Sequence, residues 1–269
     1  MIDFYAQPGP LTGIGSRHRL LVDDLPADPL AIAHAAQGLV IQPFDATPAG
    51  VPDARQPERE IRSADGMLDI IAGLSPAPLA EARPPLQRVI GCCRHFVTLA
   101  VAIMRDKGIP ARARCGFGSY FTAGQWIDHW IAEVWDGTRW VRIDIEHLDG
   151  PQAVDHTDLA PGTFATGGES WRLVRSGAAD PMAFGVAFTT NFGPGEIRAN
   201  AIRDLAALVK VEMLNWDEWG RMAESFRGTT GPDYDALIDR VADVAAADDL
   251  ATTRALYETQ DLAVPSAMI

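Results

Sequence analysis

The chain has 269 residues, of which 47% are hydrophobic and 22% charged, a mixture that supports one large domain with a substantial core. Its formal net charge of −13 repels phosphate groups, so nucleic acid and anionic membranes are excluded as expected partners. Three cysteines, two of them adjacent, do not make a disulfide framework and suit a reducing compartment.

The amino terminus lacks a basic segment followed by an apolar stretch, the pattern of a secretory signal peptide. The longest apolar run, residues 96–104, is too short to cross a bilayer. We therefore expect a cytoplasmic protein.

Proline and glycine punctuate the amino-terminal part of the chain. The pattern predicts three segments there: a helix near residues 29–38, a surface loop over residues 43–58, and a helix near residues 64–74. The last of these ends at the proline-containing breaker of residues 75–78.

The centre of the chain carries the clearest signals. Residues 91–107 form an apolar helix pattern that stops at Gly108 and Pro110, and residues 111–117 alternate as a strand does. Residues 129–135 and 139–145 are rich in β-formers and flank an Asp-Gly-Thr turn at 136–138. A helix followed by a strand and a hairpin predicts an antiparallel sheet packed on a helix.

Beyond residue 150 the chain becomes helical again, after a glycine-containing loop predicted over residues 161–170. Apolar residues recur there at helical spacing in two groups, which are Ile197, Ile202, Leu205, Leu208 and Val209, and Tyr234, Leu237, Ile238, Val241 and Val244.

Cys92 and Cys93 open the central helix. Unpaired N–H groups at a helix N-terminus favour thiolate over thiol, so either cysteine is a candidate nucleophile. An isolated cysteine on an apolar helix is more often a small core residue, and helical spacing does not choose between the two.

A nucleophilic thiol also needs a base and a group that orients the base. His129 begins a predicted strand, and Asp144 lies in the next one, where a carboxylate is costly to bury unless it is paired. If their side chains share a face of the hairpin, Asp144 can accept a hydrogen bond from the His129 ring. Each residue alone favours a structural role, but the order Cys, His, Asp on these elements favours catalysis.

Four motifs in register carry a resemblance to a known family. They are Gly-Cys-Cys-Arg-His-Phe at 91–96, Arg-Asp-Lys-Gly-Ile-Pro-Ala-Arg at 105–112, His129 with Glu133-Val134, and Trp-Val-Arg-Ile-Asp at 140–144. These resemble the transglutaminase-like superfamily, a branch of the papain-like thiol fold. The family's corresponding patterns are Gly-x-Cys-x-Asp-Phe, Arg-x-x-Gly-Ile-Pro-Ala-Arg, a histidine strand, and Trp-Val-x-x-Asp.

The resemblance is closest to bacterial transglutaminase-domain proteins of undefined activity. It includes Arg-Cys-Gly-Phe at 114–117, Tyr-Phe at 120–121, Asp-His-Trp at 128–130, and two weaker matches at 202–208 and 216–220. It implies an α+β, papain-like core: a catalytic cysteine at a helix N-terminus packed on an antiparallel sheet that carries His and Asp, with additional amino- and carboxy-terminal helices.

On this resemblance the triad is Cys93, His129 and Asp144. His95 stands where the family commonly has an acid, which leaves the hydrogen bonding at the helix start open. We expect a single domain over residues 1–269, a catalytic core at 85–150, and a helical extension at 170–269.

Other residues are weaker candidates. Trp126, Trp130, Gln87 and Arg114 could line a substrate cleft, although the tryptophans also suit a core and Gln87 the surface. Arg112 and Arg114 share one face of a strand, where solvated charges are the simpler interpretation. Without a Cys-x-x-Cys spacing or a phosphate-binding loop, we expect no metal and no cofactor.

The sequence thus predicts a thiol enzyme that transfers an acyl group from an amide or ester carbonyl. Its substrate would be a peptide, a protein or a small amide. Water as acceptor makes it a peptidase or amidase, which we favour slightly, and an amine makes it a transamidase. The alternative is a non-catalytic binding protein on the same fold, and a homodimer is compatible with either.

Overall fold

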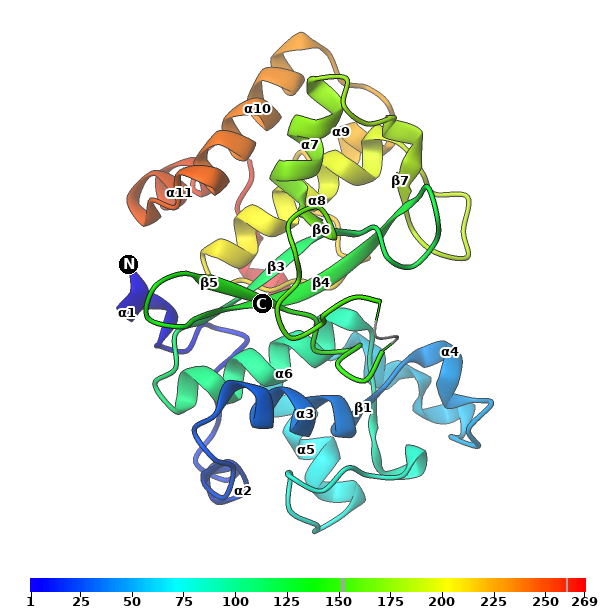
Figure 1. Ribbon diagram of the computed structural model, residues 1–269, viewed down its shortest axis with the longest axis vertical. Coiled ribbons are helices and arrows are strands. Elements are labelled where there is room, and N and C mark those ends of the chain that lie inside the picture. The colour runs from blue at the N-terminus through cyan, green and yellow to red at the C-terminus, as the bar shows by residue number, and fades with distance from the viewer. Residues whose placement is uncertain (151–152, 260) are drawn as a thin grey trace. The chain divides into compact units, whose positions relative to one another are not determined.

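The computed structural model describes residues 1–150, 153–259 and 261–269 (Figure 1). Helices and a largely antiparallel sheet make up an α+β fold, as the sequence predicts. The α-helices are α1 Ile2–Tyr5, α2 Arg19–Asp23, α3 Pro29–Leu39, α4 Pro43–Ala46, α5 Ala64–Leu74, α6 Cys93–Asp106, α7 Gly167–Arg175, α8 Pro194–Leu208, α9 Met222–Phe226, α10 Pro232–Ala247 and α11 Leu250–Tyr257.

The strands are β1 Val40–Ile41, β2 Val89–Ile90, β3 Ala111–Gly118, β4 Trp126–Trp135, β5 Trp140–Ile143, β6 Phe164–Thr166 and β7 Phe184–Gly185. Short 3-10 helices span Asp53–Glu60 (η1), Pro85–Gln87 (η2), Pro181–Ala183 (η3) and Ser266–Met268 (η4). Among the described residues, no helix has the length and apolar character that crossing a membrane requires.

The chain divides into two compact units. The first, here called the amino-terminal unit, comprises Ile2–Ala113 and Ile131–Asp158. The second, the carboxy-terminal unit, comprises Met1, Arg114–Trp130 and Leu159–Ile269.

Helix α6 is the core of the amino-terminal unit. Every residue from Cys93 to Arg105 is buried, which explains why its sequence is apolar nearly all round. It packs against α3 and α5 (Figure 1). Gly108, with a φ of +73°, ends the helix in a conformation that glycine adopts readily, and Pro110 prevents its continuation.

Two short parallel strands deliver the chain to the start of α6. Val40 and Ile41 of β1 pair with Val89 and Ile90 of β2, and the Gly91 N–H donates to the Ile41 carbonyl at 2.9 Å. The residues that follow Ile41 are therefore held beside the turn that leads into α6.

The larger sheet has the order β5-β4-β3-β6, with β7 pairing in parallel with β4. β4 and β5 form the predicted hairpin, in antiparallel register from Ala132↔Ile143 to Trp135↔Trp140. The register leaves four residues, Asp136 to Arg139, in the turn, one more than the sequence predicts.

Arginines on β3 are buried, so the expectation of solvated strand charges is wrong. Arg112 is 4% exposed, donates to Glu133 on β4 at 2.7 Å, and stacks over the Trp140 ring at 4.1 Å. Arg142 of β5 donates to the other oxygen of Glu133 at 3.0 Å. One buried carboxylate thus joins the guanidinium groups of both neighbouring strands.

The carboxy-terminal unit contains a second buried ion pair. Helices α7, α8 and α10 pack against one another there (Figure 1). Arg114 of β3 donates through two nitrogens to Asp204 of α8, at 2.9 and 2.8 Å, and the Cys115 N–H donates to the same carboxylate. The pair therefore fixes this helix to the strand.

Two segments predicted as loops contain helices. Pro43 begins α4, because proline is favourable at the first position of a helix, and η1 follows at Asp53–Glu60. Within 161–170, the Thr166 hydroxyl accepts from the Glu169 N–H while the Glu169 carboxylate accepts from the Thr166 N–H. This capping box starts α7 and could have been found in the sequence as Thr-x-x-Glu.

Replacing Asp204 by alanine should lower the free energy of unfolding by about 3–5 kcal/mol, because it leaves the Arg114 guanidinium buried without its counter-charge. Urea denaturation measures this loss. The double variant Arg114→Met/Asp204→Leu should lose less than the single variant.

Asp243→Ala is the matched control, since Asp243 pairs with Arg172 at 2.8 Å in the same unit but is 74% exposed. Its loss should be about 0–1 kcal/mol. Equal losses for the two single variants would show that burial of the Arg114–Asp204 pair has no energetic consequence.

Candidate active site

Cys92 and Cys93 form the first turn of α6 as predicted. Cys93 is the first helical residue and is 6% exposed, and Cys92 precedes it in an extended conformation. The Cys92 N–H donates to the Nδ1 atom of His95 at 3.0 Å, and the His95 N–H donates to the Cys92 carbonyl at 2.7 Å. The His95 ring thus provides a hydrogen-bond acceptor for the backbone N–H of Cys92 at the start of the helix.

The two neighbouring thiols interact. A hydrogen bond from the Cys93 side chain holds the pKa of the Cys92 thiol well below its usual value, although burial opposes the shift. The His95 ring and the Arg94 N–H act in the same direction as that hydrogen bond. The pair therefore loses its first proton more readily than an isolated thiol.

Cys115 differs from this pair. It is completely buried, and this burial raises the pKa of its thiol well above the usual value, with Asp128 and Asp204 adding to the effect. A thiol held in the neutral form behaves as a small core residue.

Asp144 lies just past the end of β5 rather than inside the strand, and it is fully buried. Its carboxylate accepts from the N–H groups of Glu146 and His147, at 3.2 and 3.3 Å. The His147 ring lies 3.1 Å and the His156 ring 3.5 Å from the same carboxylate. Asp144 thus lies beside two imidazoles, those of His147 and His156. Neither histidine is predicted from the sequence as a site residue.

His129 is placed by the carboxy-terminal unit. It is 3% exposed on β4, with Tyr120 and Phe121 edge-on to its ring at centroid distances of 6.3 and 5.0 Å. The preceding residue, Asp128, accepts from Asn200 and Asn215, each at 2.7 Å. Aromatic packing and these two amides therefore fix the orientation of this end of β4.

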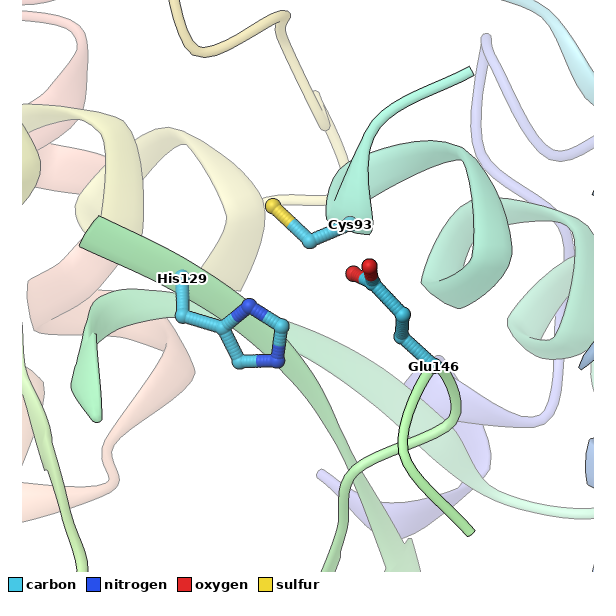
Figure 2. Close-up of side chains that lie close together, drawn as sticks. All are labelled: Cys93, His129 and Glu146. Carbon is cyan, nitrogen blue, oxygen red and sulfur yellow. The ribbon is translucent and has the colours of Figure 1, made fainter. Parts of the chain in front are cut away.

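Cys93, His129 and Glu146 lie close together, with one donor atom of each within 4.8 Å of the others. Figure 2 shows the three side chains gathered in one place, with the Glu146 carboxylate ending near Cys93. His129, Asp144 and His147 form a second such group within the same limit. Thiolate, imidazole and carboxylate are also ligands that Zn²⁺ accepts, so both groups could hold a metal ion.

Glu146 is the member of this group that the sequence analysis missed. The β4–β5 pairing ends at Ala132↔Ile143, and Glu146 lies beyond the end of β5. It also lies one residue past the strand that the sequence predicts at 139–145. Strand alternation therefore gives no indication of where this side chain points.

The remaining candidates have different surroundings. Trp130 is fully buried, and Arg114 is held in its ion pair with Asp204. Trp126 is half-buried and stacks on Phe184 with ring centroids 5.5 Å apart. Gln87 is half-buried at the end of η2.

Residues 74–145 match the family model of the transglutaminase-like superfamily. This segment is similar to that superfamily. A comparison with the curated proteins and with the solved structures returned no match. The matched segment includes Cys93, His129 and Asp144, and Glu146 follows directly after it.

A half-buried acid near Asp128 gives the protein a pH-dependent stability. Burial raises the pKa of Glu196 from 4.5 to about 7, with Asp128 and Glu218 adding to the effect and Arg203 opposing it. Between these values the unfolded chain releases the proton and the folded chain retains it, so the free energy of unfolding should fall as pH rises from 4.5 to 7.

Glu196→Gln should remove the part of the fall in the free energy of unfolding that comes from Glu196. Urea denaturation at pH 5 and pH 8 measures this difference. The exposed Glu258→Gln is the control and should behave as the unaltered protein does. The same pH dependence in Glu196→Gln as in the unaltered protein would contradict the assignment.

Proposed function

We propose that this protein is a thiol enzyme that transfers an acyl group from an amide or ester carbonyl, with Cys93 as nucleophile, His129 as base and Asp144 as the group that orients the base. The observation that carries the proposal is the approach of Cys93, His129 and Glu146 to within 4.8 Å of one another. The match of residues 74–145 to the transglutaminase-like superfamily supports the same chemistry.

In the first half of the reaction, His129 removes the proton from the Cys93 thiol, and the thiolate attacks the carbonyl carbon. The carbonyl oxygen carries the resulting negative charge. When the bond from carbon to the leaving group breaks, His129 returns the proton to the departing amine or alcohol, and the acyl group stays on Cys93 as a thioester.

In the second half, water or an amine attacks the thioester while His129 takes its proton. The Cys93 thiolate leaves, and the product is a carboxylic acid or a new amide. We propose a peptide, a protein or a small amide as substrate and hydrolysis as the main outcome. A free thiol nucleophile of this kind suits a reducing compartment such as the cytoplasm.

The surroundings of Asp144 fit an orienting role. Two backbone N–H groups accompany the imidazoles around it, so this buried carboxylate has several hydrogen-bond donors. A charged acceptor beside an imidazole favours the tautomer whose other nitrogen can take a proton from the thiol.

The test compares alkylation by iodoacetamide at each cysteine as pH is varied, with the modified site located by mass spectrometry. Cys93 should react at a pH below that at which an ordinary thiol reacts, and His129→Ala should remove the advantage. Fragmentation must separate Cys93 from Cys92, since the adjacent thiol also has a lowered pKa.

The second measurement is the release of p-nitrophenol from p-nitrophenyl acetate, with the acetylated residue identified by mass. Cys93→Ala and His129→Ala should lower the rate by about 100-fold or more, whereas Cys115→Ala should not change it. If only Cys92 reacts, or if Cys93 is no faster than Cys115, the Cys93 triad is not assembled, and the alternative of a non-catalytic binding protein is favoured.

A further inference from the structure

A thiol enzyme of this kind needs two hydrogen-bond donors for the oxygen that becomes negative when the thiolate attacks. The backbone N–H of Cys93 is the natural first donor. It belongs to the first turn of α6, where a backbone N–H has no acceptor within the helix. The second must come from a side chain held near the same turn.

Gln42 is the side chain that the fold brings to this turn. It follows β1 directly, and the parallel register of Ile41 with Ile90 places it level with Gly91, two residues before Cys93. The hydrogen bond from the Gly91 N–H to the Ile41 carbonyl fixes this register. Gln42 is therefore close to the nucleophile although it lies 51 residues earlier in the sequence.

The Gln42 side chain already binds an anionic oxygen beside the thiol. Its Nε2 atom donates to Oε1 of Glu146 at 2.6 Å, and a Glu146 carboxylate oxygen lies within 4.8 Å of the Cys93 sulfur. Gln37 donates to the backbone carbonyl of Glu146 at 3.1 Å, which holds the residue in place. All four residues belong to the amino-terminal unit.

The Gln42 side chain borders a cavity. Gln42, Gln37, Glu146 and Phe96 line a cavity of about 730 Å³ in the same unit. This volume lies within the range of small-molecule sites.

We propose that Gln42 is the second oxyanion donor of this site and that the Glu146 carboxylate occupies it until the substrate displaces it. This inference rests on the proposed function. The carboxylate oxygen marks where the negative oxygen of the tetrahedral adduct accepts its hydrogen bond from Gln42. Before substrate binds, the same carboxylate keeps the Gln42 amide directed at the thiol.

Two reactions of Cys93 distinguish this role from a structural one. Acylation by p-nitrophenyl acetate places negative charge on a carbonyl oxygen, whereas alkylation by iodoacetamide displaces iodide from a saturated carbon and develops no such charge. Gln42→Leu should therefore lower the acylation rate by about 10²–10³-fold and leave the alkylation rate unchanged.

Gln56→Leu is the matched control, because Gln56 is also half-buried in the amino-terminal unit and its amide donates to the Pro43 carbonyl at 3.2 Å. It should change neither rate. Glu146→Ala should raise the ratio of acylation to alkylation, since the donor is then vacant. If Gln42→Leu does not fold, Gln42→Asn keeps the amide on a shorter side chain and should lower acylation alone.

The outcomes separate the two proposals. If the unaltered protein neither acylates nor alkylates at Cys93, the proposed function fails. If it does both, and Gln42→Leu acylates as fast as Gln56→Leu or loses both reactions equally, the thiol enzyme stands and the role of Gln42 is wrong.

Discussion

The first turn of α6 is buried, and the site depends on how its backbone N–H groups are satisfied. A helix start leaves several of these groups without partners inside the helix. Here the His95 ring accepts from Cys92, which requires it to fold back over Gly91. A Cβ atom at Gly91 would lie 2.4 Å from the His95 ring, so only glycine permits this arrangement. The position of the Cys93 thiol thus follows from one glycine and one histidine.

Asp144 and Glu146 have different hydrogen-bond partners. Asp144 lies beside imidazoles and accepts from two backbone N–H groups. The Glu146 carboxylate accepts from the side-chain amide of Gln42, whereas Gln37 donates to the backbone carbonyl of Glu146. Another anionic oxygen could accept the same hydrogen bond from the neutral Gln42 amide.

Much of the fold could be predicted because its signals are local. Pro29, Gly108 and Pro110 mark helix ends, and the Asp-Gly turn marks the β4–β5 hairpin. The parts that could not be predicted depend on partners distant in the chain. Arg114 is buried because Asp204, 90 residues later, meets it, and Gln42 reaches Glu146 across 104 residues. Glu146 was missed because it lies past the end of β5, where strand alternation does not indicate which side chains share a face.

The carboxylate of Glu133 also has a consequence for how the sheet assembles. A slip of β4 by two residues against its neighbours would preserve the alternation of buried and accessible faces, so hydrophobicity alone would scarcely oppose it. It would, however, carry Glu133 away from Arg112 and Arg142 and leave charges buried without partners. The ion pair therefore favours the observed register, from Ala132↔Ile143 to Trp135↔Trp140, over misaligned hairpins during folding.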